Sequence, residues 1–317
     1  RRRAVSPPST NDAFDDLPVI EALGLHTSWG AFADGIGTLD RIAPARVLAA
    51  AHGVATGEVI SLVVPLDAFD PPLFGRPRVR HEIVENGRNI HEDVIDGFNP
   101  QAASQWDGLL HVRAREHGFY GGITDIDEAA GSLGIERWAR RGIVGRGVLV
   151  DVPRHAAVAG IVDWNPADEL TLEPEALAAI LDAEGVRLEP GDILCLRFGW
   201  LADDRRRRAA GEDRWKAGHR FAGLAAHDGM VRLLWESGVA AVCADNPAVE
   251  SAPGDPANGS LHRKLIPGLG FALGELLDFD DLAVACEARG RYDFLFVSAP
   301  LPITGGASST ANALAIL

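Results

Sequence analysis

Cysteine is scarce in this sequence, and no two cysteines lie close together in it. Of the 317 residues only Cys195, Cys243 and Cys286 are cysteines, and no C-x-x-C motif occurs. Each lies in an apolar stretch, which predicts buried free thiols in a reducing, cytoplasmic compartment. A nucleophilic cysteine is the alternative, but such thiols need accessible, electropositive surroundings.

Basic residues are also in short supply. The chain has 30 Lys and Arg against 45 Asp and Glu, a formal net charge of −15. A nucleic-acid partner requires a basic surface and an anionic membrane attracts one, so the composition argues against both. No apolar run reaches the ~20 residues that span a bilayer. The polar residues 1–16 have no signal-peptide core and predict a flexible tail, which leaves a small molecule as the expected partner.

Several familiar catalytic motifs are missing. The sequence contains neither a G-x-S-x-G nucleophile elbow nor a G-x-x-x-x-G-K-[ST] phosphate loop. Residues 268–274 (GLGFALG) approach the dinucleotide-binding fingerprint but have one residue too many before the last glycine. These absences disfavour a serine α/β-hydrolase, a P-loop nucleotide site and a dinucleotide site.

Short apolar runs alternate with helical patterns along the chain, which indicates an α/β protein. The mix of 47% hydrophobic and 24% charged residues is that of a globular domain, and we expect one domain over residues 17–317. The β-rich runs are residues 59–65, 147–152, 192–198, 239–244 and 294–297, and the predicted helices are residues 44–52, 174–184 and 222–237. Residues 83–95 are mixed and polar.

The most informative segment is residues 99–122, NPQAASQWDGLLHVRAREHGFYGG. Gln101, Gln105, Asp107 and His111 all fall at odd positions, so an extended chain would place them on one face. The same extended chain would separate Gln101 from His111 by ~33 Å, so the segment must turn if these residues share a site. A polar loop with a capping Asp107 and a surface His111 is the competing interpretation.

The spacing resembles the signature H-x-G-T-H-x-D-x-P-x-H of the cyclase superfamily, which includes bacterial kynurenine formamidase and isatin hydrolase. Here the segment reads Q-A-A-S-Q-W-D-G-L-L-H, with Gln at both early His positions. Further resemblance comes, in family order, from residues 28–30, 37–39, 119–122, 141–151, 189–200, 244–250, 262–275 and 299–313. It implies a mixed sheet or barrel-like core flanked by helices, the swivelling β/β/α cyclase-like fold, in a homodimer or homotetramer.

The resemblance also implies roles for individual residues. The catalytic candidates are His111, Asp107, His262 and Glu275; the metal-ligand candidates are Gln105, Asp107, His262 and Glu275; the substrate-binding candidates are Gln101, Trp106, Asp245 and Asn246. Gln oxygens suit Mn²⁺ better than Zn²⁺, so Mn²⁺ is expected ahead of Zn²⁺ if a divalent metal is bound at all.

The expected function is hydrolysis of an amide, lactam or ester bond in a small molecule, with carbon–nitrogen bonds favoured. In this reaction a metal-activated water would attack the bond, and His111 would be the acid/base group. Two alternatives stay open. One is a metal-free cyclase, dehydratase or isomerase that uses Asp107 and His111, and the other is a small-ligand-binding protein without catalysis.

Overall fold

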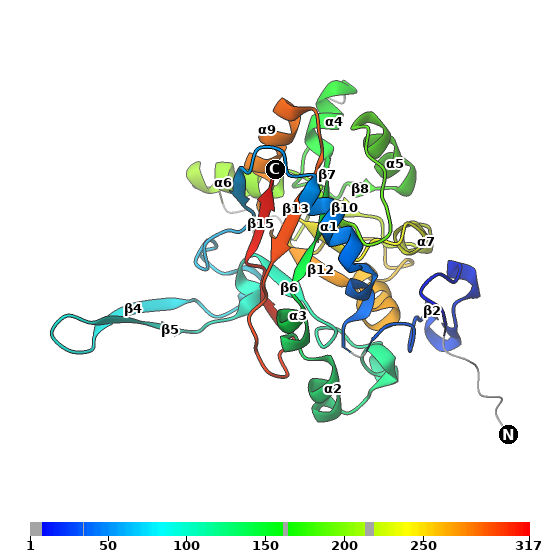
Figure 1. The fold of residues 1–317 in the computed structure, drawn as a ribbon, viewed down its shortest axis with the longest axis horizontal. Helices are drawn as coiled ribbons and strands as arrows, with labels where there is room; N and C mark the ends of the chain where they lie inside the picture. The colour runs from blue at the N-terminus through cyan, green and yellow to red at the C-terminus, as the bar shows by residue number, and fades with distance from the viewer. Residues whose placement is uncertain (1–7, 34, 161–163, 213–218) are drawn as a thin grey trace.

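A curled nine-stranded sheet forms the centre of the molecule (Figure 1). The structure is a computed structural model and describes residues 8–33, 35–160, 164–212 and 219–317. In spatial order the strands are β14 (Ser308–Thr310), β6 (Gln105–Asp107), β12 (Ala272–Glu275), β11 (Ala241–Ala244), β9 (Ile193–Arg197), β7 (Ile143–Asp151), β13 (Asp293–Ser298), β15 (Ala313–Ile316) and β3 (Val59–Ser61). The central strands β12, β11, β9 and β7 run parallel, and the flanking strands pair antiparallel. The mixed α/β single domain expected from the sequence is confirmed.

The parallel strands are apolar because helices and loops cover both of their faces. Leu149, Leu194 and Val242 have no exposed surface. All three cysteines are free and buried, as their apolar surroundings predict. The helices are α1 (Pro44–His52), α2 (Ile126–Leu133), α3 (Glu136–Arg141), α4 (Val152–Val158), α5 (Pro174–Ala183), α6 (Trp200–Ala209), α7 (Asp228–Glu236), α8 (Leu261–Arg263) and α9 (Asp280–Arg289). None of the helices in the described ranges is both long and apolar enough to cross a membrane.

Two segments differ from the sequence-based expectation. The helix expected over 222–237 begins only at Asp228, where His227 accepts a hydrogen bond from the Gly229 amide. Residues before it form the short strand β10 (Gly223–Leu224), which pairs with β8 (Thr171–Leu172). A Cβ on Gly223 would lie 2.2 Å from the Glu250 backbone. Close tertiary contact at Gly223 therefore overrides the helical preference of the surrounding residues.

The second difference is a long hairpin. Strands β4 (Arg80–Glu85) and β5 (His91–Asp96) pair with each other and extend away from the body of the molecule (Figure 1). The mixed, polar composition of residues 83–95 gave no indication of this arm, because neither of its faces is covered by the domain.

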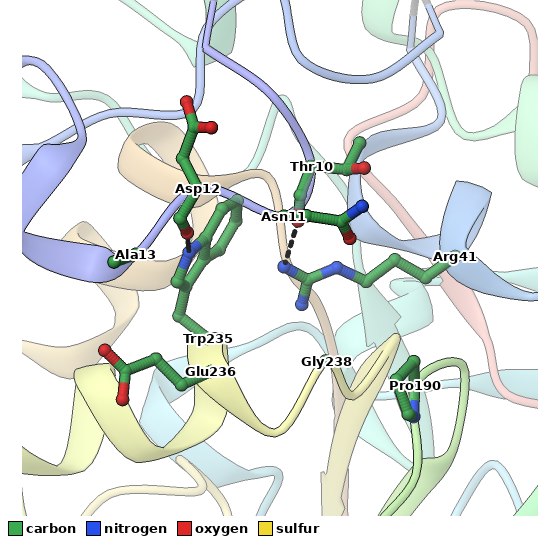
Figure 2. A pocket seen from close by; sticks show the side chains of 9 residues that line it. All are labelled: Thr10, Asn11, Asp12, Ala13, Arg41, Pro190, Trp235, Glu236 and Gly238. Atoms are coloured by element: carbon green, nitrogen blue, oxygen red, sulfur yellow. Dashed lines mark hydrogen bonds between the residues drawn. The ribbon is translucent and has the colours of Figure 1, made fainter.

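The N-terminal segment is docked on the domain, not free, as far as the structure describes it. Phe14 in the short 3-10 turn Phe14–Asp16 is buried. The Trp235 indole nitrogen donates a 2.8 Å hydrogen bond to the Asp12 carbonyl, and the Arg41 guanidinium lies 4.3 Å from the Trp235 ring (Figure 2). Residues 12–16 of the flexible tail expected over residues 1–16 thus contact the domain in this structure, and residues 1–7 lie outside the described ranges. Strands β1 (Val19–Ile20) and β2 (Leu25–His26) follow.

Candidate active site

The candidate site begins on β6, where alternate side chains point to opposite faces. Gln105 and Asp107 lie on one face and Trp106 on the other, where its indole nitrogen donates to Ser298 Oγ over 2.9 Å. Trp106 is completely buried in the hydrophobic core, away from the polar face of the strand. Gly108 then lets the chain leave the sheet, since a Cβ there would lie 2.9 Å from the Ala307 carbonyl oxygen.

The segment around β6 turns on both sides, which brings its polar residues together. Gln101 lies in the 3-10 turn Pro100–Ala102, where Asn99 Oδ1 accepts the Gln101 amide hydrogen over 2.9 Å. His111 lies in the turn that follows β6, with its amide bonded to the Gly108 carbonyl. Gln101 Nε2 donates to Asp107 Oδ1 over 2.7 Å and is 2.9 Å from His111 Nδ1. The chain thus turns in the way that a shared site requires.

The distal residues reach the same place from β12 and α8. Glu275 pairs directly with Gln105 across the sheet, and Gln105 Nε2 donates to Glu275 Oε2 over 2.5 Å. His262 Nε2 lies 2.8 Å from Glu275 Oε1 and 3.7 Å from Asp107 Oδ2. The rings of His111 and His262 are neighbours, with centroids 6.3 Å apart. Two distant parts of the sequence therefore form one cluster.

Three residues of the cluster have the arrangement of a metal site. One ligand atom each from Asp107, His262 and Glu275 lies within 4.8 Å of the others. Asp107 Oδ2 and Gln105 Oε1 are buried and, among the described residues, have no hydrogen-bond partner. Carboxylate oxygens, an imidazole nitrogen and an amide oxygen form a set that suits a divalent cation. The residues present therefore fit such an ion.

Glu250 holds the His262 ring, a role that the sequence did not reveal. Its Oε1 lies 2.9 Å from His262 Nδ1, and its carboxylate also accepts the Ser260 hydroxyl and the Leu261 amide hydrogens. A carboxylate bonded to one ring nitrogen leaves the other directed at the site, the usual support for a metal-binding histidine. No spacing rule could have found Glu250, because its role depends on the turn that precedes α8.

Carboxylates dominate the electrostatics of the cluster. Burial alone would lower the pKa of His262, but the neighbouring carboxylates of Asp107, Glu250 and Glu275 raise it well above the ordinary value. Burial, with the nearby Asp107 charge, raises the pKa of Glu275 to about 7. Burial would also raise the pKa of Asp107, yet His262 and His111 lower it. The space between the carboxylates therefore favours positive charge, which either a proton on His262 or a cation can supply.

His111 and Arg76 lie at the accessible side of the cluster. The His111 side chain is 29% exposed, and burial with the nearby His262 and Arg76 charges lowers its pKa despite Asp107. Arg76 donates to the Gln101 carbonyl, and partial burial lowers the pKa of its guanidinium against the opposing effect of Glu275 and Asp107. Arg76 is a second site residue that the sequence did not indicate.

Asp245 and Asn246 have their polar atoms engaged by the backbone. The Asp245 carboxylate accepts the amide hydrogens of Phe198 and Gly199, which precede α6, and of Trp200, its first residue. Asn246 Nδ2 donates to the Ala222 carbonyl over 2.7 Å, and its Oδ1 accepts the Val249 amide hydrogen. Neither side chain contacts the cluster in these hydrogen bonds, which instead stabilise the loops that follow β9 and β11.

Comparison with known proteins identifies the family. Residues 60–251, more than half of the chain, match the family model described as putative cyclase. The chain belongs to the putative cyclase family. The match includes Gln101, Gln105, Asp107 and His111 and ends before His262 and Glu275.

Solved structures share the cyclase fold over nearly their whole length. A crystal structure of a novel cyclase is 29% identical, with a TM-score of 0.79 over 92% of this chain and 99% of the other. Isatin hydrolase A from Ralstonia solanacearum is 17% identical, with a TM-score of 0.59 over 86% and 97% of the chains. Isatin hydrolase A from Labrenzia aggregata is 19% identical, with a TM-score of 0.55 over 84% and 96%. The search of curated protein sequences found no match.

Proposed function

We propose that this cyclase-family protein is a hydrolase that cleaves an amide, lactam or ester bond in a small molecule. The observation that carries the proposal is the convergence of Asp107, His262 and Glu275 within 4.8 Å, beside the accessible His111. The name isatin hydrolase on two proteins of similar fold is in keeping with such a reaction. Carbon–nitrogen bonds are the favoured substrate class.

Asp107, His262 and Glu275 would hold the cation, and the buried Gln105 amide oxygen, which has no hydrogen-bond partner among the described residues, is a further candidate ligand. A bound divalent ion would polarise a substrate carbonyl and lower the pKa of a water molecule. Oxygen donors outnumber nitrogen in this set, which favours Mn²⁺ over Zn²⁺. Glu250 keeps the His262 ring in position through Nδ1.

His111 is the group that we assign to proton transfer. Its lowered pKa keeps the imidazole neutral at pH 7, so the ring can take up a proton and pass it to the leaving nitrogen or oxygen. Gln101 Nε2 donates to Asp107 and lies 2.9 Å from His111 Nδ1, so Gln101 places the ring next to the carboxylate. Arg76, next to Gln101, supplies a positive charge that can hold a polarised oxygen of the substrate.

A second candidate follows from the two glutamines. Gln101 Nε2 donates to Asp107 and Gln105 Nε2 donates to Glu275, so both carboxylates already have partners without a cation. In that case Asp107 and His111 would act as a metal-free acid/base pair for a cyclisation, dehydration or isomerisation. A small-ligand-binding protein without turnover is the non-enzymatic alternative.

The test is turnover of a panel of small amides, lactams and esters by the purified protein. We expect hydrolysis that is lost in a chelator and restored by Mn²⁺, and a fall in kcat of roughly 10²–10⁴-fold for His111→Ala. His117→Ala, a partly exposed histidine of the following turn, is the matched control and should keep full activity. Turnover that persists in the chelator but not in His111→Ala would favour the metal-free enzyme. Tight binding without turnover would favour the binding protein.

A further inference from the structure

A second cavity lies between the N-terminal segment and the end of α7 (Figure 2). Residues 10–13 line one part of it, and Arg41, Pro190 and the α7 residues Trp235 and Glu236 line the rest. Its volume is about 420 Å³, which lies within the roughly 300–1,000 Å³ that is typical of small-molecule sites. It shares no lining residue with the cluster of the candidate active site, so it is a separate place at which a ligand can bind.

The Arg41 guanidinium is held firmly at the wall of this cavity. It lies 4.3 Å from the centroid of the Trp235 ring and 5.5 Å from that of Phe32. Nη1 donates to the Val239 carbonyl over 3.0 Å, and Nη2 donates to the Thr10 carbonyl over 3.4 Å. Two ring contacts and two backbone acceptors therefore fix the position of the positive charge.

No described carboxylate pairs with Arg41, although the side chain is half-buried. Other half-buried arginines of the chain are neutralised, as Arg146 is by Asp192 and Asp293. Burial lowers the pKa of Arg41 to about 10, so the group is still charged at pH 7. A charge that leaves water is costly unless an opposite charge accompanies it. The anion that would balance Arg41 is thus missing from the described part of the chain.

The two acidic residues in the lining do not supply that anion. Figure 2 shows the carboxylates of Asp12 and Glu236 directed away from the guanidinium. Asp12 is held there by its backbone, because its carbonyl accepts the 2.8 Å hydrogen bond from the Trp235 indole. A guanidinium has five N–H groups, and those of Arg41 that do not bond to Val239 or Thr10 have no acceptor among the described residues. They remain available to a ligand.

We propose that this cavity binds a small organic monocarboxylate, with its carboxylate group on Arg41 and its carbon skeleton against Pro190 and Ala13. The planar fork of a guanidinium matches the two oxygens of a carboxylate, and this pairing is stronger than one between neutral groups. Arg41 is the only positively charged residue in the described lining, and Asp12 and Glu236 are negative. One cation among two anions balances a single negative charge, which disfavours a doubly charged phosphate.

The ligand would also strengthen the docking of the N-terminal segment. The hydrogen bond between Arg41 and the Thr10 carbonyl is long, at 3.4 Å, and residues 10–13 line the cavity. A carboxylate on Arg41 would contact this segment and the body of the domain together. Because a ligand that binds only the folded chain stabilises it, the midpoint of thermal unfolding should rise with ligand concentration.

The experiment titrates the full chain with butyrate and benzoate, with saturation-transfer NMR and thermal unfolding as the two measurements. Butanol and benzyl alcohol are the uncharged analogues, and inorganic phosphate is the alternative anion. We expect saturable binding of the carboxylates, none of the alcohols, and weaker binding of phosphate. Arg41→Gln should weaken carboxylate binding by about 10-fold or more, because it removes a charged pair of hydrogen bonds.

Two further variants make this result specific. Arg141→Gln is the matched control, because Arg141 is another half-buried arginine that donates to backbone carbonyls, those of Ile42 and Gly142, and it does not line the cavity. It should bind butyrate like wild type. Asn11→Trp changes an exposed residue of the lining, leaves Arg41 in place and should weaken binding by filling the cavity. Circular dichroism confirms folding, and Asn11→Trp decides if Arg41→Gln does not fold.

Several results would overturn the proposal. One is no binding of either carboxylate to the folded wild type. A second is equal affinity in the wild type and the folded Arg41→Gln variant, or in Asn11→Trp if that variant has to decide, which would place the carboxylate elsewhere, such as at the Asp107–His262–Glu275 cluster. Equal binding of the alcohols, or tighter binding of phosphate than of both carboxylates, would also contradict it.

Discussion

At the scale of single residues, the site depends on how each carboxylate is partnered. Asp107 and Glu275 contact His262 Nε2, whereas Glu250 contacts Nδ1 on the opposite side of the ring. This gives Glu250 a different role from the other two. It orients the ring through Nδ1, whereas Asp107 and Glu275 face Nε2.

Glu250→Gln tests that orienting role. Because the amide keeps the shape of the side chain but removes its charge, we expect weaker Mn²⁺ binding by about 10-fold or more, the range seen when supporting carboxylates are replaced. Calorimetric titration measures the affinity. Glu58→Gln, an exposed glutamate beside β3, is the control and should bind like wild type. Equal affinity in wild type and Glu250→Gln would contradict the role.

The sequence predicted part of this residue-scale arrangement. The odd-position spacing of Gln101, Gln105, Asp107 and His111 indicated a shared face, and only the family resemblance added His262 and Glu275. Asp245 and Asn246 were substrate-binding candidates from the same resemblance, and in the structure their side chains bond to neighbouring backbone. Residue type and position at a strand end do not distinguish a ligand from a loop-stabilising group.

At the scale of elements, the end of α5 contains a buried carboxylate that should make stability depend on pH. Glu184 follows α5 and accepts the Asp151 amide hydrogen over 2.9 Å. Burial raises the pKa of Glu184 to about 7, with a smaller contribution from the Asp151 charge. A carboxyl group with a raised folded-state pKa stabilises the protein while protonated, so this stability is lost as pH rises from the unfolded pKa towards 7.

Glu184→Gln should remove that dependence. Between about pH 4.5 and 7 the wild type should lose up to about 3 kcal/mol more unfolding free energy than the variant, which has nothing to ionise there. Urea unfolding at pH 4.5, 6 and 7.5 measures the difference. Parallel pH profiles for the two proteins would show that Glu184 ionises as it does in the unfolded chain.

Element prediction succeeded where a single physical signal dominated. The apolar runs in 147–152, 192–198, 239–244 and 294–297 correspond to buried strands, and Pro44 and Pro174 begin helices. It failed where tertiary contacts decide. Gly223 lies in a strand because it pairs with β8 and packs against the Glu250 backbone. The strands of the β4–β5 arm have no buried face, so their sequence does not alternate between apolar and polar residues.

At the scale of the whole molecule, the sheet order explains why remote residues meet. β6 lies between β14 and β12, so residues near position 107 and position 275 are neighbours although they are far apart in sequence. The α8 turn then brings His262 over the end of β12. Such proximity comes from strand order, which local patterns do not encode.

On the scale of the whole molecule we propose that Asp107, His262 and Glu275 together hold a divalent cation beside His111. The most direct test is calorimetric titration of Mn²⁺ into chelator-stripped wild type, Asp107→Asn, Glu275→Gln and the control Glu58→Gln, with circular dichroism to confirm folding. We expect one saturable site per chain in wild type and control, weakened at least about 10-fold in the two site variants. Absence of binding to the folded wild type, or equal affinity in all four proteins, would contradict it.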